Sequence, residues 1–210
     1  MTSFLDQTNK DPGKGSGTKR QGTLLSRDVR SRESDDIARV KGLFSSILAE
    51  ADIIHEAGKA HLRISPETIL VNADGSAKLL DDGFLYTLPS DGKTVRLAGN
   101  CSEDVNLISI GIAGEVRVTE DVFLIGRVLF YMLSGRHVDY LEDIILNSKA
   151  WIRDAAKRLA VSPDDPALLN LTKIAYVCMM AYPANRYQSI GDIASDLVFG
   201  FSCWEKVLKI

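Results

Sequence analysis

The sequence predicts a mainly helical domain with one short β-hairpin. Five stretches of the chain carry apolar residues at helical spacing, whereas only one pair of short apolar runs is joined by a tight turn. That turn, Asn-Ala-Asp-Gly at residues 72–75, separates residues 69–71 from residues 77–80, as in two antiparallel strands. At 210 residues, of which 45% are hydrophobic, the chain is long enough for one sizeable core but short for two.

The charge, the hydrophobic pattern and the cysteines of the sequence argue against several classes of protein. The net charge of −3 gives no reason to expect a nucleic-acid partner. The sequence has neither a long apolar run nor the apolar core of a signal peptide, so we expect a cytoplasmic protein without a membrane span. Cys101, Cys178 and Cys203 are widely spaced and do not cluster with the histidines, which favours free thiols over a metal site or a disulfide framework.

Residues 1–33 form a polar and basic segment. They carry seven Lys and Arg against four Asp and Glu, together with four glycines and almost no apolar periodicity. Such a composition buries too little apolar surface to offset its ordering entropy, so we predict a disordered tail followed by a folded domain over residues 34–210. The Gly-rich residues 13–17 lack the spacing of a phosphate-binding loop and favour a linker. The basic tail could contact an acidic partner or a lipid.

The first predicted helix leads directly into the hairpin region. The Ser-Asp-Asp sequence at residues 34–36 supplies an N-cap, and Gly58 supplies a stop. Between them, apolar side chains recur at helical spacing at Ile37, Val40, Phe44, Ile47, Leu48, Ala51 and Ile54. Later helices are predicted over residues 119–135, 143–159, 168–180 and 189–204, and residues 143–159 could form one amphipathic helix or two.

The loop between the first helix and the hairpin resembles the catalytic loop of protein kinases. His61 to Leu70 (HLRISPETIL) follows the family pattern His-Arg-Asp-Leu-Lys-Pro-Glu-Asn-Ile-Leu, and Asp-Asp-Gly at residues 81–83 falls where kinases carry Asp-Phe-Gly. With the later landmarks in family order, the resemblance covers about residues 37–200. It implies the helical large (C-terminal) lobe of a kinase. Because the first helix begins only about 36 residues into the sequence and no Gly-rich loop signal precedes it, we expect no N-terminal lobe.

The residues that carry kinase chemistry differ from the family pattern. The catalytic base, an Asp in the family, matches Arg63, which cannot accept a proton. The phosphate-contacting Lys matches Ser65, and the metal-binding Asn matches Thr68, a poorer ligand for Mg²⁺. Asp81 remains as a single possible metal carboxylate, and Asp82 replaces the apolar residue of the second motif. The resemblance therefore implies a degenerate loop without catalytic residues.

Other matched positions imply structural roles. Asp121, at the start of the central helix, would accept hydrogen bonds from the loop backbone near His61 and Leu62. Arg186 would match a structural arginine whose usual glutamate partner belongs to an Ala-Pro-Glu motif that is missing here, with Glu115 or Glu120 as substitutes. The positions with an implied structural role are His61, Pro66, Asp81, Gly83, Asp121, Gly126 and Arg186.

These observations favour a pseudokinase that acts as a protein-interaction or scaffold module without a cofactor. It is similar to the kinase non-catalytic C-lobe (KIND) domains, whose kinase-like large lobe binds other proteins. We expect the partner to be another protein that docks on the surface which would face an N-terminal lobe. The candidate surface consists of Leu62, Arg63, Leu70, Asp82 and Phe84.

Two alternatives stay open. One is an atypical protein kinase that uses Asp81 or Asp82 with Mg²⁺ and ATP, its cleft completed by another chain. The other is a nucleotide-binding protein without transfer activity, with Arg63 or Lys78 on a phosphate. Against the second, an arginine in such a loop often pairs with a neighbouring carboxylate, and Asp81 and Asp82 are the nearest candidates.

Overall fold

The computed structural model describes residues 22–32, 35–80, 85–87, 94–96, 115–138 and 148–200. The helices are α1 (Leu25–Arg30), α2 (Ile37–Glu56), α3 (Thr119–Ser134), α5 (Ser148–Arg158), α6 (Pro166–Cys178) and α7 (Ile190–Phe199), with a 3₁₀ turn at Pro183–Asn185. The strands are β1 (Gly22–Leu24), β2 (Lys59–Ala60), β3 (Ile69–Asn72), β4 (Ala77–Leu79), β5 (Tyr86–Thr87), β6 (Thr94–Arg96) and β7 (Glu115–Arg117).

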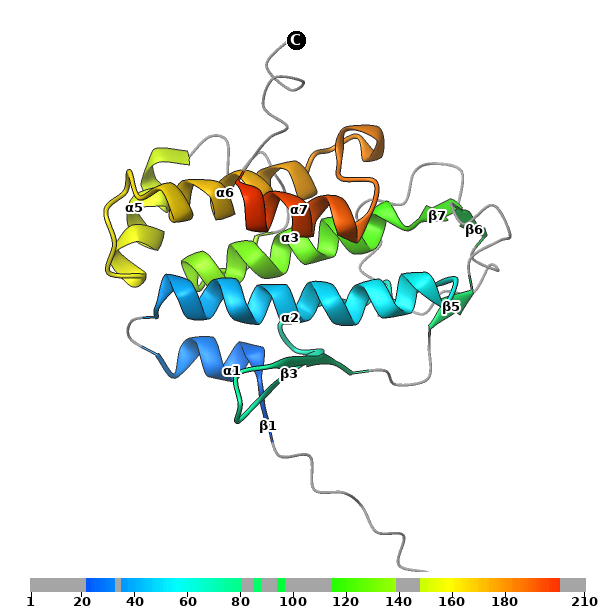
Figure 1. Cartoon of the computed structure of the whole chain (residues 1–210), viewed down its shortest axis with the longest axis horizontal. Helices are drawn as coiled ribbons and strands as arrows, with labels where there is room; N and C mark the ends of the chain where they lie inside the picture. Colours follow the sequence, from blue (N-terminus) through cyan, green and yellow to red (C-terminus); the bar gives the residue numbers. More distant parts are fainter. Residues whose placement is uncertain are drawn as a thin grey trace, which may run out of the picture.

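The helix α3 is the centre of the fold, as the sequence predicted. Of its 16 residues, all but Arg127 and Ser134 are buried. Figure 1 shows α2 running across the middle of the molecule with α3 behind and above it, α6 and α7 above α3, and the small sheet below. Gly135 ends α3 in the left-handed conformation at a φ of 72°, where a side chain would be strained. The mainly helical fold predicted from the sequence is confirmed.

The helix α2 follows the predicted pattern closely. Asp36 accepts a hydrogen bond from the N–H of Ala38 at 2.8 Å and caps the helix, and Gly58 follows its end with a φ of 67°. The residues of α2 that are buried are Val40, Leu43, Phe44, Ile47, Leu48 and Ala51. The packing of α2 therefore fixes the position at which the loop at residues 61–68 begins.

The predicted hairpin is present, and other short strands extend the β content. Strands β3 and β4 pair in an antiparallel ladder that places Leu70 opposite Lys78, and Gly75 in the turn has a φ of 83°. Strand β1 pairs with the other edge of β3, so that the sheet has three strands in the order β1-β3-β4. Two further pairs, β2 with β5 and β6 with β7, were not predicted, because strands of two or three residues carry no periodic signal.

Order begins earlier than the sequence predicted. Residues 22–32 were assigned to a disordered tail, but they form β1 and α1, and Leu25 and Val29 are almost fully buried. The backbone N–H of Ser26 donates to the carbonyl of Pro66 at 3.0 Å, and the hydroxyl of Tyr131 donates to the carbonyl of Ser26 at 3.1 Å. The prediction was wrong here because these contacts come from residues far along the chain, which local composition does not register. Residues 1–21 lie outside the described part.

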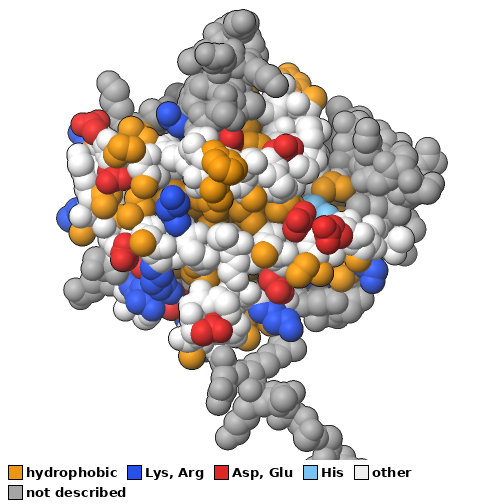
Figure 2. Space-filling model, in the orientation of Figure 1, with side chains coloured by type: hydrophobic (Ala, Val, Ile, Leu, Met, Phe, Trp, Pro, Cys, Tyr) orange, Lys and Arg blue, Asp and Glu red, His pale blue; other side chains and the backbone are white. Residues whose placement is uncertain are grey.

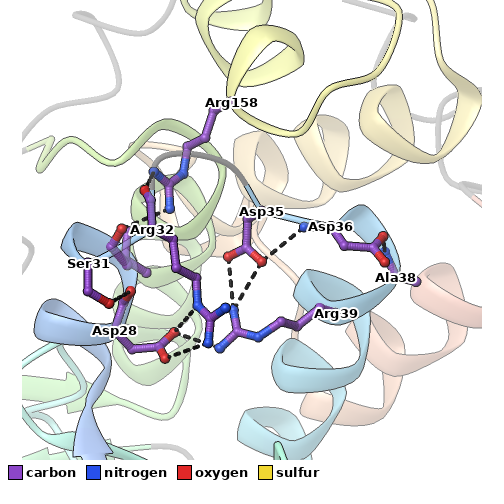
Figure 3. A network of polar contacts seen from close by, with 9 residues as sticks. Asp28, Ser31, Arg32, Asp35, Asp36, Ala38, Arg39 and Arg158 are labelled. Carbon is purple, nitrogen blue, oxygen red and sulfur yellow. Dashed lines mark hydrogen bonds and ion pairs between the residues drawn. The ribbon is translucent and has the colours of Figure 1, made fainter.

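A network of charged side chains fastens α1 to α2 and α5 (Figure 3). The carboxylate of Asp28 accepts hydrogen bonds from Arg39 at 2.6 Å and from Arg32 at 3.1 Å. Arg39 reaches Asp35 as well, at 2.9 Å, and Arg158 of α5 donates to a backbone carbonyl at the end of α1 at 3.0 Å. Because Arg39 of α2 binds the carboxylates of both Asp28 and Asp35, it links α2 to α1.

The last helix packs on α2 through one face only. A capping box starts α7, in which Ser189 and Asp192 exchange hydrogen bonds, and Ile190, Ile193 and Leu197 are buried. Val198 and Phe199 are exposed, and Figure 2 shows hydrophobic side chains in a band across this face of the molecule. The helix ends before Gly200, short of the predicted residue 204, and residues 201–210 lie outside the described part. Among the described helices, none is long and apolar enough to cross a membrane.

Gly126 tests the packing of α3 on α6. A methyl group there would lie 2.5 Å from Cβ of Cys178 and 2.8 Å from Cγ of Met179, closer than packed atoms allow. We expect Gly126→Ala to lower the free energy of unfolding by about 1–3 kcal/mol in urea unfolding. The control is Gly42→Ala on the exposed face of α2, where nothing lies within 4 Å, and it should stabilise the protein by up to about 1 kcal/mol. An unchanged stability of Gly126→Ala would contradict the α3–α6 interface.

Asp28 gives a prediction for acid pH. Burial alone would raise the pKa of Asp28, but hydrogen bonds from Arg32 and Arg39 outweigh it and hold the pKa below its ordinary value of 3.8. A carboxyl with a lowered pKa in the folded state stabilises the protein above its ordinary pKa, and that contribution is lost as the pH falls through the lowered value. Between about pH 5 and pH 3, Asp28→Asn should therefore lose less of its urea stability than the wild type does. Asp164→Asn, at an exposed site, should fall in parallel with the wild type.

Candidate functional site

The carboxylate of Asp121 holds the start of the loop at residues 61–68. Asp121 is 0% exposed, and its two oxygens accept hydrogen bonds from the backbone N–H groups of His61 at 2.8 Å and Leu62 at 2.7 Å. These are the contacts that the sequence predicted. His55 Nε2 lies 2.9 Å from Oδ2 of Asp121, and it is the donor because a carboxylate oxygen only accepts. Three donors thus compensate for a charge that would be costly to bury alone.

The backbone at Leu62 takes a conformation that needs this support. Its φ of 56° lies in the left-handed region, which costs a residue with a Cβ about 1–2 kcal/mol. The hydrogen bond from its N–H to Asp121 offsets that cost. Leu62 is only 3% exposed, so the prediction that it forms part of an open partner surface was wrong. The left-handed turn directs its side chain into the protein.

His61 has a structural place in the loop. Its Nε2 lies 3.2 Å from the carbonyl of Leu80, so Nε2 donates, and its Nδ1 accepts the backbone N–H of Arg63 at 3.3 Å. Both ring nitrogens are therefore used within the protein, and the ring is 3% exposed. This arrangement ties the loop to the end of β4.

The hydroxyl groups of the loop are engaged by its own backbone. Thr68 Oγ1 lies 2.7 Å from the carbonyl of Arg63, to which it donates, and it accepts the N–H of Ser65 at 2.9 Å. Ser65 Oγ accepts the N–H of Glu67 at 3.3 Å. At the positions that match the kinase metal ligand and phosphate-contacting lysine, the side chains therefore close the loop on itself.

The loop and α3 enclose a pocket of about 230 Å³. Three of the predicted loop positions, Arg63, Ser65 and Thr68, line it together. Arg127 on α3 and His137 after its end also line it, and the sequence analysis missed both. Arg127 carried a signal that could have found it, because it is a charged residue inside an otherwise apolar helix and such a residue needs a polar partner.

Only part of the predicted partner surface can be located. Arg63 and Leu70 are partly exposed, and Lys78 is exposed beside Leu70 on the neighbouring strand. Leu70 lies against Gly22 of β1, where an added Cβ would come within 2.8 Å of the leucine side chain. Four predicted residues lie outside the described part of the chain: Asp81, Asp82, Gly83 and Phe84.

Pro66 and Arg186, two further positions that match the kinase pattern, make structural contacts. Pro66 is buried and accepts the N–H of Ser26, as described above. Arg186 lies 3.2 Å from Glu120 Oε2, one of the two glutamates that the sequence proposed as its partner, and it donates at 2.7 Å to the carbonyl of Met180. Burial lowers the pKa of Arg186, while the charge of Glu120 acts in the opposite direction. The pair fixes the start of α3 against the chain before α7.

Asp121 should therefore be a stability residue. Asp121→Ala leaves the N–H groups of His61 and Leu62 unpaired in the core, and we expect it to cost about 2–4 kcal/mol in urea unfolding. The control is Glu56→Ala, one residue from His55 but exposed, which should change the stability by no more than about 0.5 kcal/mol. Equal, small losses in both variants would show that the hydrogen bonds to Asp121 do not hold the loop.

Comparison with known proteins relates the chain to protein kinases. No family model matches it. Over 185 residues, 80% of this chain, it is 26% identical to a probable serine/threonine-protein kinase of Corynebacterium efficiens. It is 35% identical to serine/threonine-protein kinase CHK1 of Mycosarcoma maydis over 44% of this chain, and 30% identical to CBL-interacting protein kinase 5 of Oryza sativa subsp. japonica over 55%.

The chain spans 28%, 14% and 25% of the lengths of these three relatives. Their names describe whole kinases, whereas the similarity is confined to part of each. The mainly helical structure with its small antiparallel sheet is consistent with the large lobe of a kinase. Over part of its length, the chain is a distant homologue of serine/threonine protein kinases.

Proposed function

We propose that this chain is a non-catalytic, kinase-like domain that works as a protein-interaction or scaffold module, in the manner of KIND domains. The observation that carries the proposal is the combination of a firmly held loop with an arginine, Arg63, at the position of the catalytic base. The loop geometry is maintained by Asp121, His61 and Thr68, while the group that would accept a proton is replaced.

Arg63 is incompatible with the chemistry of a kinase base. A guanidinium is protonated at every physiological pH and has no lone pair to accept the proton of a substrate hydroxyl. The loop also offers poor support for a metal, because the Thr68 hydroxyl lies within hydrogen-bonding distance of two backbone groups of the loop itself. Phosphoryl transfer depends on positioned charge, and these substitutions change the charge at the centre of the site.

A protein-binding role is compatible with the fixed arrangement of the loop and α3. Asp121 and the Arg186–Glu120 pair hold the loop and α3 in one arrangement, and such a surface is suited to recognition because little order has to be gained on binding. Arg63 and Leu70 are partly exposed at or near this loop. We place the partner protein there.

The proposal predicts that the chain transfers no phosphate. Purified protein is incubated with radiolabelled ATP and Mg²⁺, alone and with a generic basic substrate, beside an active serine/threonine kinase as positive control. We expect no labelled product from the wild type, because Arg63 cannot act as the base. Mg²⁺-dependent transfer by the wild type that Asp81→Asn abolishes would overturn the proposal in favour of an atypical kinase.

A thermal-unfolding titration with ATP and Mg²⁺ in the same samples addresses binding without transfer. Ligand at a hundred times its dissociation constant stabilises the folded state by about 2.7 kcal/mol, so a nucleotide site would be visible as a clear upward shift. We expect none. A shift that Arg63→Gln or Lys78→Gln removes would identify a nucleotide sensor instead.

A further inference from the structure

We propose that the end of the molecule where α1 meets α5 binds an acidic segment of a partner protein. We call this surface the basic end, and it consists of Arg27, Arg30, Arg32, Arg153, Lys157 and Arg158. The inference goes beyond the proposed function, because it adds a second surface to the one at Arg63 and Leu70 and names the chemistry of what binds there.

Three cations of the basic end come from the segment for which the sequence predicted a disordered basic tail. In the structure, Arg27 and Arg30 lie on α1 and Arg32 follows it directly. The burial of Leu25 and Val29 holds this helix on the core. A helix that is already fixed loses less entropy on binding than a disordered tail does, so these charges are better placed for recognition than the sequence indicated.

Arg158 joins the two helices at their C-terminal ends. Its guanidinium donates to the carbonyl of Val29 at 3.0 Å, and its own carbonyl accepts the N–H of Asp35 at 3.0 Å. Figure 3 shows this side chain reaching from α5 to the end of α1. Cations at residues 27–32 and 153–158, far apart in the sequence, are therefore brought to one end of the molecule.

Positive charge exceeds negative charge on these two elements. Residues 25–32 and 150–158 contain six Lys and Arg against two Asp, although the whole chain has a net charge of −3. The carboxylates of this region are already engaged by donors of the same chain: Asp28, Asp35, Asp36 and Asp154. Asp28 lies between Arg32 at 3.1 Å and Arg39 at 2.6 Å, and Asp154 pairs with Arg136 at 3.1 Å.

Other cations of the basic end meet no carboxylate in the described part of the chain. Arg27, Arg153 and Lys157 are exposed and form no ion pair there. Arg30 is exposed as well, and its Nε donates to the hydroxyl of Tyr131 at 3.4 Å, which is a neutral acceptor. Their charge is therefore available to a partner.

The spacing of the arginines suits an extended peptide with acidic residues at alternate positions. Arg27 and Arg30 lie three residues apart on one face of α1, where Cβ atoms are about 5–6 Å apart. In an extended peptide, every second side chain points to the same side, about 6.4–6.8 Å from the last. Successive carboxylates can therefore meet successive guanidinium groups, which bind them through paired hydrogen bonds.

Two features favour an acidic peptide over a nucleic acid or a membrane. Asp28 and Asp154 lie among the cations and interrupt the positive surface that a continuous phosphate backbone would need. The exposed large hydrophobic side chains of the described part are Ile53, Tyr182, Val198 and Phe199, and none belongs to α1 or α5. Those two helices thus offer no such side chain to stack on a base or to enter a bilayer.

The test is binding of the full-length chain to fluorescent peptides, followed by anisotropy at low ionic strength. One peptide has glutamate at alternate positions separated by serine, and the reference peptide has glutamine in place of every glutamate. We expect the glutamate peptide to bind at least about tenfold more tightly, and the difference to shrink as salt is added. Equal binding of the two peptides would overturn the proposal. So would tighter binding of a single-stranded DNA oligonucleotide or of phosphatidylserine vesicles than of the glutamate peptide.

Paired substitutions locate the surface. Arg27→Gln with Arg30→Gln, and separately Arg153→Gln with Lys157→Gln, should each weaken binding of the glutamate peptide at least about fivefold. The matched control is Lys59→Gln with Lys78→Gln, which removes the same charge from two exposed lysines on β2 and β4 and should leave the affinity unchanged.

Thermal unfolding checks that the first pair, which loses the bond from Arg30 to Tyr131, remains folded, and the second pair gives an independent result. An affinity that survives both pairs, or that the control pair lowers equally, would show that the basic end is not the binding surface. Neither outcome affects the proposed non-catalytic function, which is tested by phosphate transfer.

Discussion

The hydrogen bonds to the buried carboxylate of Asp121 are the interaction on which the rest of the site depends. A fully buried carboxylate is unfavourable unless donors surround it, and here the donors come from the end of α2 and from the first two residues of the loop. The same bonds stabilise the left-handed backbone of Leu62. The turn at Leu62 sets the direction in which the chain continues. The positions of Arg63 and of the pocket wall therefore depend on the carboxylate of Asp121 on α3.

The contacts that hold the loop and α3 in place are different from the outward-facing side chains of the loop. Gly126 allows α3 to approach α6 closely, Arg186 joins the start of α3 to the chain before α7, and Asp121 joins α3 to the loop. These contacts depend on backbone atoms and on buried side chains, so they tolerate any loop side chain that points outward. Because the hydroxyl of Thr68 adds a further bond within the loop, the side chain of Arg63 can differ from that of a catalytic loop while the loop keeps its path.

The parts of the site that could be predicted are those at which the motifs of this sequence match the order and spacing of the kinase pattern. The resemblance to kinases implied the contact of Asp121 with residues 61 and 62 and gave Glu115 and Glu120 as alternative partners of Arg186, of which the structure shows Glu120. The hairpin turn with Gly75 follows from the local sequence. Spacing does not report side-chain direction, which is why Leu62 was placed on the surface although it is buried. Nor does it report contacts between distant segments, and so α1 was assigned to a disordered tail. His137 was missed for the same reason, since it reaches the loop only through the folding of α3.

In the proposed function, Arg63 stands at the position where the kinase pattern has an acidic base, and this changes which groups the loop attracts. A carboxylate at this position favours cations and hydroxyl protons, whereas a guanidinium favours anions, and the energy of either interaction depends on how little the protein must rearrange to form it. The bonds to His61 and Thr68 fix the backbone of Arg63 in advance, and the bond to Val138 does the same for the guanidinium of Arg127. In the proposed role, the rigidity that a kinase loop needs for catalysis serves affinity instead, because a positioned charge loses less entropy when its ligand binds.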